Sequence, residues 1–369
     1  MFRNIKGQDQ VVQLLTTQIN NDRVAQAYLF HGSDGVGKFI TALYFGMGLN
    51  CLSSNEFRPC GVCSSCRKFL AFEHTDFSYL FPSVRLDLSL DGEIKNADGL
   101  KQYEAFIRNK IENPWLDFSW DGSTEIRKES VLMLSKRLEM SSMEARYRIV
   151  IIEDAEQMNN TTANAFLKKL EEPPSQTVII LITERLSMLL PTIISRCQQV
   201  YFKPLSPATI ETILSDNFDV ESAIARTAAR IAGSNLKQAI RIAHDSSSQI
   251  RDLAFSLAEL AFRKDELSFY NLLTKQRDFL NAGKTQELIK YLCILVNDLA
   301  LLPSNPDLIT NVDRMEQITQ LAGSGSDLTE QARNFLIYSE DLNRKITGNV
   351  NLSLILIGLF HALTDCLHP

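Results

Sequence analysis

The chain has 369 residues, 45% of them apolar, a formal net charge of −6 and a pI near 5.5. This length allows two or three domains. The acidic balance excludes a protein that is basic all over, so any nucleic-acid contact must come from a local cluster of Lys and Arg or from partners in an assembly. No basic stretch with a following apolar run opens the chain, and the late apolar run Leu354–Phe360 is too short to cross a bilayer. We therefore expect a cytoplasmic protein without membrane contact.

A glycine-rich segment follows the first predicted helix, over 11–19, and the first predicted strand, over 27–30. An apolar helix is predicted after it, over 40–49. The segment reads Gly32-Ser33-Asp34-Gly35-Val36-Gly37-Lys38-Phe39. It fits the phosphate-binding loop Gly-x4-Gly-Lys, in which backbone N–H groups and a helix N-terminus cradle phosphates and the Lys reaches the terminal ones. A glycine turn with an incidental Lys is the alternative, and the strand–loop–helix context favours the P-loop.

Four cysteines follow at the spacing Cys51-x8-Cys60-x2-Cys63-x2-Cys66. Seven cysteines without a secretion signal favour thiols or metal over disulfides. Four thiolates on a turn-rich segment suit a closed tetrahedral Zn²⁺ site, which leaves no position open for substrate and is therefore structural. One alternative is scattered free cysteines, which the rarity of Cys and the wide separation of Cys197, Cys293 and Cys366 argue against. The other is His74 as a competing ligand, which the complete Cys set argues against.

The regular apolar pattern of the sequence weakens after a predicted strand over 76–82. Residues from about 84 to 125 are polar and aromatic by turns, and we interpret them as an insertion. The aromatic side chains there have two interpretations. Exposed, they would mark a surface for a partner; buried, they would pack the insertion against the rest of the domain, which is the interpretation we favour. Helical spacing returns over 126–138.

A strand buried on both faces is predicted at Ile149–Ile152, directly before Glu153 and Asp154. In a parallel sheet, such a strand brings acids to the edge where nucleotide-binding folds hold metal and phosphate. A solvated strand end is the alternative. A helix should follow, with Ala165, Leu167 and Leu170 near one face, and a Pro-Pro pair ends it.

Two further features follow this helix. The run 177–183 predicts another fully buried strand, which ends in Thr183 at the same sheet edge. The triplet Ser195-Arg196-Cys197 precedes a last strand over 200–203. Helical spacing then dominates to the C-terminus.

The run from Ala163 to Pro174, Ala-Asn-Ala-Phe-Leu-Lys-Lys-Leu-Glu-Glu-Pro-Pro, strongly resembles the central motif of bacterial clamp-loader subunits. These are AAA+ proteins that open the sliding clamp for replicative DNA polymerase. The resemblance covers the chain almost end to end, and it is best over 32–66 and 149–203. Subunits of the gamma/tau and delta-prime type carry a zinc module with this Cys spacing directly after the P-loop helix.

The resemblance implies an α/β fold with three domains. An AAA+ P-loop domain, a parallel sheet flanked by helices, would span 1–203, with a zinc module at 51–66 and the insertion at about 84–125. A small helical lid would span 204–246, and Ser246-Ser247-Ser248 would link it onward. An all-α collar domain for oligomerisation would span 250–369.

The resemblance also implies roles for single residues. Arg196 would be an arginine finger placed in trans against the ATP of a neighbouring subunit, which suits an always-charged forked guanidinium. A surface Arg that caps its own helix is the alternative. Thr183 would be a sensor of the terminal phosphate, with a purely structural Thr equally compatible. Lys237 is the best match to a phosphate-contacting Arg of the lid, although a Lys lacks the fork.

Two departures from the family pattern concern the chain's own ATP site. Phe39 stands where a Ser or Thr hydroxyl should ligate Mg²⁺. Glu153 then Asp154 invert the family's Asp-Glu order, so each acid is displaced by about 1 Å, enough to cost on the order of a hundredfold in rate. ATP with Mg²⁺ remains a possible ligand, but we expect the site to be degenerate in turnover.

These features favour a delta-prime-like scaffold of the DNA polymerase III holoenzyme. Such a subunit would bind gamma/tau and delta subunits, help load the sliding clamp onto primed DNA, and donate Arg196. An ATP-hydrolysing gamma/tau-type motor is the alternative, and another AAA+ DNA remodeller such as a Holliday-junction helicase is a weaker one. Direct contact with DNA phosphates is assigned to Lys168 and Lys169 as weak candidates.

Overall fold

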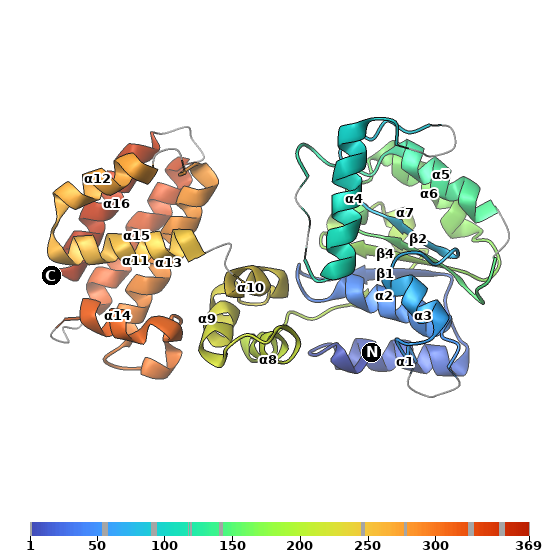
Figure 1. Ribbon diagram of the computed structural model, residues 1–369, viewed down its shortest axis with the longest axis horizontal. Helices are drawn as coiled ribbons and strands as arrows, with labels where there is room; N and C mark the ends of the chain where they lie inside the picture. The colour runs from blue at the N-terminus through green and yellow to red at the C-terminus, as the bar shows by residue number, and fades with distance from the viewer. Residues whose placement is uncertain are drawn as a thin grey trace. The chain divides into compact units, whose positions relative to one another are not determined.

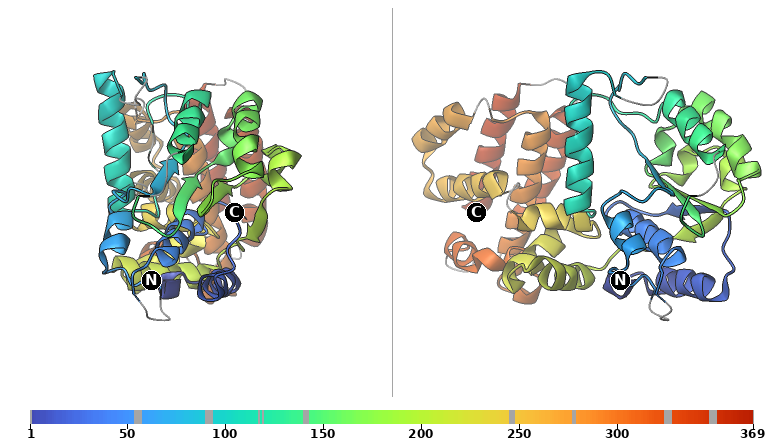
Figure 2. Two further views of the ribbon diagram at one scale, coloured as in Figure 1. Left: turned by 90° about the vertical axis from the view of Figure 1, so that its right-hand side faces the viewer. Right: turned by 45° about the vertical axis from the view of Figure 1, so that its right-hand side comes forward.

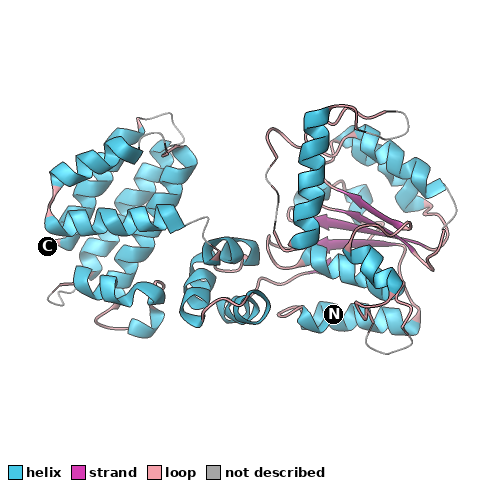
Figure 3. Ribbon diagram, viewed as in Figure 1, coloured by secondary structure: helices cyan, strands magenta, loops and turns pink. Residues whose placement is uncertain are grey.

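The computed structural model describes residues 2–53, 58–89, 94–116, 118, 120–139, 143–244, 248–276, 279–323, 328–346 and 351–368. The chain divides into two compact units, Met1–Thr209 with Ser234–Lys237, and Ile210–Gly233 with Gln238–Pro369. The first contains a sheet, and the described part of the second is helical (Figures 1 and 3). The three-domain division stays a prediction, and the predicted linker residues Ser246 and Ser247 lie outside the described residues.

Five parallel strands form one sheet in the order β2-β3-β4-β1-β5. They are β1 (Ala27–His31), β2 (Phe77–Leu80), β3 (Arg148–Ile152), β4 (Thr177–Thr183) and β5 (Gln198–Tyr201). Every residue of β3 and β4 is buried, because these central strands are covered on both faces. The predicted parallel sheet flanked by helices is confirmed, and β4 separates the P-loop strand β1 from the acid-bearing strand β3.

Helices lie on both sides of the strands (Figure 3). One face packs against α5 (Lys128–Glu139), α6 (Asn160–Glu171) and α7 (Pro191–Ile194) through Val131, Phe166 and Ile193. The other face holds α2 (Lys38–Leu49), which contacts α1 (Asp9–Asn21) and α3 (Ser64–Leu70). A Cβ at Gly46 of α2 would lie 2.8 Å from the Ile149 side chain, so glycine permits this close packing.

The apolar face predicted for α6 is right for Leu170 and wrong for Ala165 and Leu167. The helix buries Ala163, Phe166 and Leu170, whereas Ala165 and Leu167 are only half-buried. The buried face of α6 is therefore rotated about the helix axis relative to the predicted face. Phe166 supplies more apolar surface to the core than Ala165 does.

The insertion contains a helix that no sequence pattern indicated, α4 (Ala97–Glu112). Three views show it as a long helix beside the others of its unit (Figures 1 and 2). Aromatic rings fold it onto the body: the Phe106 ring lies 4.0 Å from Phe81 and 5.2 Å from Trp120, measured between centroids. Phe118 packs edge-on to Phe106 at 5.8 Å. The interpretation that aromatic side chains anchor the insertion is confirmed.

The second unit is built from helices around one apolar core. Its helices are α9 (Ser222–Ala232), α11 (Ser248–Arg263), α12 (Glu266–Gln276), α13 (Ala282–Leu301), α14 (Met315–Leu321), α15 (Thr329–Ile346) and α16 (Leu352–Leu367). Two more, α8 (Pro207–Phe218) and α10 (Leu236–Ala243), each contribute residues to both units. No described helix has the length and apolar character needed to span a bilayer.

A buried polar network stabilises this unit. The buried Arg251 donates to Asn311 Oδ1 at 2.8 Å and lies 2.6 Å from Asp313 Oδ1. Thr227 of α9 donates to the same Asp313 at 2.9 Å. The network therefore bonds α9 to the short segment around Val312–Arg314, η5.

Candidate nucleotide and metal sites

The P-loop connects β1 to α2 and adopts a conformation that requires glycine. Gly35 and Gly37 have φ values of 69° and 89°, and a Cβ at Gly35 would lie 2.1 Å from Asn235 Oδ1. The buried Lys38 folds back onto its own loop, because Nζ donates to the carbonyl oxygens of Gly32 at 2.8 Å and Ser33 at 2.6 Å. Burial lowers the pKa of Lys38.

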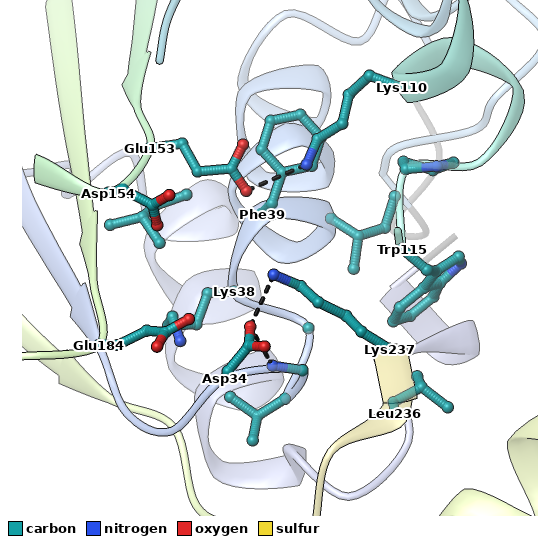
Figure 4. A pocket seen from close by; sticks show the side chains of 16 residues that line it. Asp34, Lys38, Phe39, Lys110, Trp115, Glu153, Asp154, Glu184, Leu236 and Lys237 are labelled. Carbon is teal, nitrogen blue, oxygen red and sulfur yellow. Dashed lines mark hydrogen bonds and ion pairs between the residues drawn. The ribbon is translucent and has the colours of Figure 1, made fainter. Parts of the chain in front are cut away.

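Asp34 forms the centre of a polar cluster over this loop (Figure 4). Its Oδ1 lies 2.7 Å from Lys237 Nζ and accepts from the Gly35 N–H at 2.7 Å, while Oδ2 accepts from Asn235 at 3.0 Å. Burial opposes ionisation, but the Lys237 ammonium outweighs it and the pKa of Asp34 is lowered. Burial and the Asp34 carboxylate raise the pKa of Glu184 to about 7. Lys237 thus pairs with the protein's own carboxylate where the resemblance implied a phosphate contact.

Glu153 is buried and already paired. Its Oε1 lies 3.1 Å from Lys110 Nζ, and its Oε2 accepts from the Tyr79 hydroxyl. Burial opposes ionisation of Glu153, but Lys110 outweighs it and the pKa of the carboxyl is lowered. The Phe39 ring lies 5.0 Å from Tyr79, and Lys110 Nζ stands 4.1 Å from the Phe39 centroid.

Asp154 and Thr183 lie at the same sheet edge as Glu153. Asp154 sits in the turn after β3 with a left-handed φ of 48°. Thr183 ends β4 and pairs in register with His31, the last residue of β1. Its buried hydroxyl accepts from the Arg185 N–H at 3.1 Å, which gives it a local structural role. The sensor role of Thr183 stays a prediction.

The cavity at this edge is small. Residues 34–40 of the P-loop region line it together with Lys110, Pro114, Trp115, Glu153, Asp154, Ile182, Glu184, Leu236 and Lys237. Its free volume is about 30 Å³, enough for one or two water molecules. No hydroxyl follows Lys38, and Glu153 is engaged by a lysine. In this arrangement the residues do not fit Mg²⁺ with a nucleoside triphosphate.

The sequence did not predict several residues of this cavity, among them the charged or aromatic residues Lys110, Trp115 and Glu184, which lie outside the recognised motifs. Lys110 and Trp115 belong to the insertion, and Glu184 follows β4. Lys110 lies one turn after the buried Phe106 on α4. A charged residue at that i+4 spacing on the apolar face was the available signal.

Arg196 lies in the turn between α7 and β5 and is exposed. Its Nη1 donates to the Thr192 carbonyl at 2.9 Å, and its Nη2 lies 2.6 Å from Glu171 Oε1 at the end of α6. Among the described residues that line the P-loop cavity, Arg196 does not appear. The side chain is presented outward and not to the chain's own site.

The four cysteines of the predicted metal site come together. The Sγ atoms of Cys51, Cys60, Cys63 and Cys66 all lie within 4.8 Å of one another. The Cys60 and Cys66 sulfurs are 4.0 Å apart, close to the separation of about 3.8 Å that a tetrahedron with Zn–S bonds of about 2.3 Å requires. His74 is buried, accepts from the Asp76 N–H through Nδ1 and is not part of the cluster.

Backbone amides support the cluster. The N–H groups of Cys60, Cys63 and Cys66 point at the sulfurs of Cys51, Cys60 and Cys63, at 3.4, 3.4 and 3.5 Å. A hydrogen bond from the Val62 amide is the main cause that lowers the pKa of Cys60 to about 6. Such donors stabilise the Cys60 thiolate, whereas burial raises the pKa of Cys51 and Cys66. The geometry of the four sulfurs is that of a cluster that could hold a metal ion.

The parallel sheet, the P-loop after β1 and the acids after β3 define a P-loop protein. Residues 7–206 match the family described as DNA polymerase III, delta subunit, and the chain belongs to this family. It is delta-prime-like, and its role is that of a clamp-loader subunit in DNA replication.

The chain is similar to the following individual proteins. The chain is 27% identical over 348 residues to the DNA polymerase III subunit delta' of Bacillus subtilis (strain 168), covering 94% of this chain and 92% of that protein. It is 28% identical over 214 residues to the gamma/tau subunit of Mycobacterium tuberculosis (strain H37Rv), covering 58% of this chain and 30% of that one. A solved gamma subunit-related protein of Thermotoga maritima aligns with a TM-score of 0.45 and 15% identity, over 96% of this chain and 99% of that chain.

Proposed function

We propose that this chain is a scaffold subunit that does not hydrolyse ATP itself and that completes the ATP site of a neighbouring subunit with Arg196. In this role it assembles with gamma/tau-type and delta-type subunits and acts, through the assembly, on the sliding clamp and primer-template DNA. One contrast carries the proposal: the chain's own acid Glu153 is paired with Lys110, whereas Arg196 is exposed outside the cavity.

The chemistry of the two places supports this division of labour. A P-loop ATPase holds Mg²⁺ with the Ser or Thr after the P-loop Lys and with a strand-end acid. Here those positions hold Phe39 and a lysine-paired Glu153. A partly exposed guanidinium, held at the surface by Glu171 and the Thr192 carbonyl, suits the opposite task, stabilising charge on a phosphate that another subunit binds.

The test is a loader reconstituted with Arg196→Ala. An arginine finger contributes a factor of about 10³ to 10⁵ in kcat. The ATPase site that this subunit completes should therefore lose its activity, while the other sites of the loader continue to hydrolyse ATP. Arg196→Lys should restore little, because a Lys lacks the fork. Arg85→Ala is the matched control, since Arg85 is an exposed arginine of the same unit. An unchanged ATPase in the Arg196→Ala loader refutes the finger.

The gamma/tau-type motor is the competing function. It is tested by incubating the purified chain with ATP, Mg²⁺, clamp and primed DNA. Robust turnover by this chain alone would overturn the scaffold proposal and make the chain a motor, or another AAA+ remodeller if turnover needs DNA but no clamp.

We further propose that the metal held by the four cysteines is Zn²⁺ with a structural role. The all-thiolate donor set and the sulfur separations support a closed tetrahedral site. Bound there, Zn²⁺ would crosslink the loop that contains Cys51 to the start of α3.

We also propose the domain organisation 1–203, 204–246 and 250–369. The bond between Thr227 of α9 and Asp313, together with the donation from Arg230 to the Asp307 carbonyl at 2.9 Å, supports a lid helix fixed to the collar. A fixed lid helix suits a rigid scaffold better than a motor whose lid must move with each nucleotide.

A further inference from the structure

The insertion helix α4 places a buried cation against the degenerate acid. Lys110 is only 3% exposed, and its Nζ lies 3.1 Å from Glu153 Oε1 and 4.1 Å from the centre of the Phe39 ring. Figure 4 shows the lysine reaching across the ring to the carboxylate. Residues 43 positions apart in the chain thus form one buried ion pair.

The two contacts of Lys110 involve Phe39 and Glu153, two of the three residues that depart from the P-loop pattern. Phe39 stands where a hydroxyl would ligate the metal, and Glu153 stands where the metal-binding acid would be. An aromatic face and a carboxylate together suit an ammonium group, through a cation–π contact and an ion pair. Phe39 and Glu153 therefore act together as one binding site for an ammonium group. They are not two independent losses of metal-binding groups.

Neighbouring side chains hold the lysine in this position. The Tyr79 hydroxyl donates to the other oxygen of Glu153, so both carboxylate oxygens are engaged. Phe106, one turn before Lys110, stacks on Phe81 at 4.0 Å and anchors α4 to the end of β2. Trp115 follows α4 and would touch a Cβ at Gly37 at 3.4 Å.

We propose that Lys110 is a tethered cation that takes the place of the divalent metal ion, so that α4 closes the site and keeps it folded without Mg²⁺ or nucleotide. The proposal rests on the proposed function only in treating the site as one that does not turn over. The proposal gives the insertion a structural role, because α4 supplies the positive charge that neutralises the buried Glu153 carboxylate. Removal of the lysine should uncover a site with affinity for divalent cations.

The experiment uses the purified full-length chain, thermal unfolding and calorimetric titration with Mn²⁺ and Mg²⁺. Lys110→Met keeps the length of the side chain but strands a buried carboxylate, so Tm should fall by about 10 °C. Lys110→Ala should also lower Tm, and millimolar Mn²⁺ should restore part of the loss with about one site per chain. The wild-type Tm should not respond to either cation.

Two further variants separate this explanation from general damage. Lys110→Ala with Glu153→Gln should lose the response to Mn²⁺, because the carboxylate is gone. Lys101→Ala, on the exposed side of the same helix, should change neither Tm nor cation binding. Should Lys110→Ala fail to fold, Lys110→Met with Glu153→Gln decides: recovery of Tm relative to Lys110→Met supports the proposal, and no recovery overturns it.

The proposal is overturned if the wild-type chain is stabilised by Mn²⁺ as strongly as Lys110→Ala, or if Lys110→Met leaves Tm unchanged. No ATPase enters these readouts. Failure of the arginine finger in the reconstituted loader would therefore leave the cation result standing, and failure of the cation result would leave the finger standing.

Discussion

Arg196 Nη2 lies 2.6 Å from Glu171 Oε1, so the arginine assigned to a neighbour's ATP is held in this chain by the last residue of α6. Glu171 belongs to the Leu-Glu-Glu-Pro-Pro run that carries the family resemblance. The ion pair is partly exposed, with 34% of the Arg196 side chain and 48% of the Glu171 side chain accessible. In the proposed finger role, Glu171 would orient Arg196, and a phosphate would replace this acid at small cost.

Glu171→Gln tests this orientation. An exposed ion pair contributes about 0–1 kcal/mol, so ATP turnover by the reconstituted loader should change by less than about fivefold. The Arg196→Ala loader should lose far more, on the order of a thousandfold at the affected site. Steady-state ATPase measured on both loaders checks the ranking. A loss in Glu171→Gln as deep as in Arg196→Ala would show that Glu171 takes part in catalysis.

Phe39→Thr alone should not restore an ATPase. The substitution returns the missing hydroxyl, but Lys110 still occupies Glu153 and the order of the acids stays inverted. It should also lower the free energy of unfolding by about 3–5 kcal/mol, because a buried ring leaves a cavity. Single-turnover hydrolysis and urea denaturation measure the two effects. Restored hydrolysis by this one change would show that the hydroxyl was the sole defect.

Cys63→Ser should abolish binding of the proposed Zn²⁺. Purified without chelator, the wild-type chain should contain about one zinc per chain and the variant far less, by elemental analysis. Thermal unfolding of the wild type with a strong chelator should resemble the variant. Cys197→Ser is the matched control, because Cys197 lies outside the four-sulfur cluster. Equal zinc in both variants would exclude the four-cysteine site.

Glu184→Gln should stabilise the chain only at higher pH. Burial and Asp34 raise the pKa of Glu184 to about 7 in the folded state, from its ordinary value of 4.5. The folded chain therefore binds more protons than the unfolded chain between these values, and its stability falls as pH rises from 4.5 to about 7. Gln lacks this loss. Tm values should coincide below pH 4.5 and favour the variant at pH 8. The difference should be modest, because Glu184 is only partly withdrawn from solvent and water screens its interactions.

Arg251→Met should destabilise the second unit. Asp313 would lose its buried partner, and stranding a buried charge costs about 3–5 kcal/mol. Burial opposes ionisation of Asp313, and Arg251 holds its pKa low in spite of it. Denaturant unfolding measures the loss, and Arg333→Met, at an exposed position of α15, serves as control. Equal midpoints for the two variants would contradict a stabilising role of the network.

Local pattern determined the parts of this protein that the sequence alone could predict. The strands β1, β3 and β4 are runs of apolar residues that the structure buries, because a central parallel strand has no polar face. The four cysteines lie within sixteen residues of chain from Cys51 to Cys66, so spacing was enough to bring the sulfurs together. The departures from the P-loop pattern could be read directly from the residue types at Phe39, Glu153 and Asp154.

Tertiary structure alone decided how the protein uses those departures. Lys110 and Glu153 are 43 residues apart, and Asp34 and Asn235 are 201 apart. No periodicity within α4 indicates which acid its lysine will meet, because that depends on where Phe106 stacks. The buried face of α6 is likewise decided by tertiary structure. It depends on the size of the Phe166 side chain and on the core that Phe166 enters. Residue types are encoded locally, whereas the partner of a buried charge is chosen by the packing that brings distant segments together.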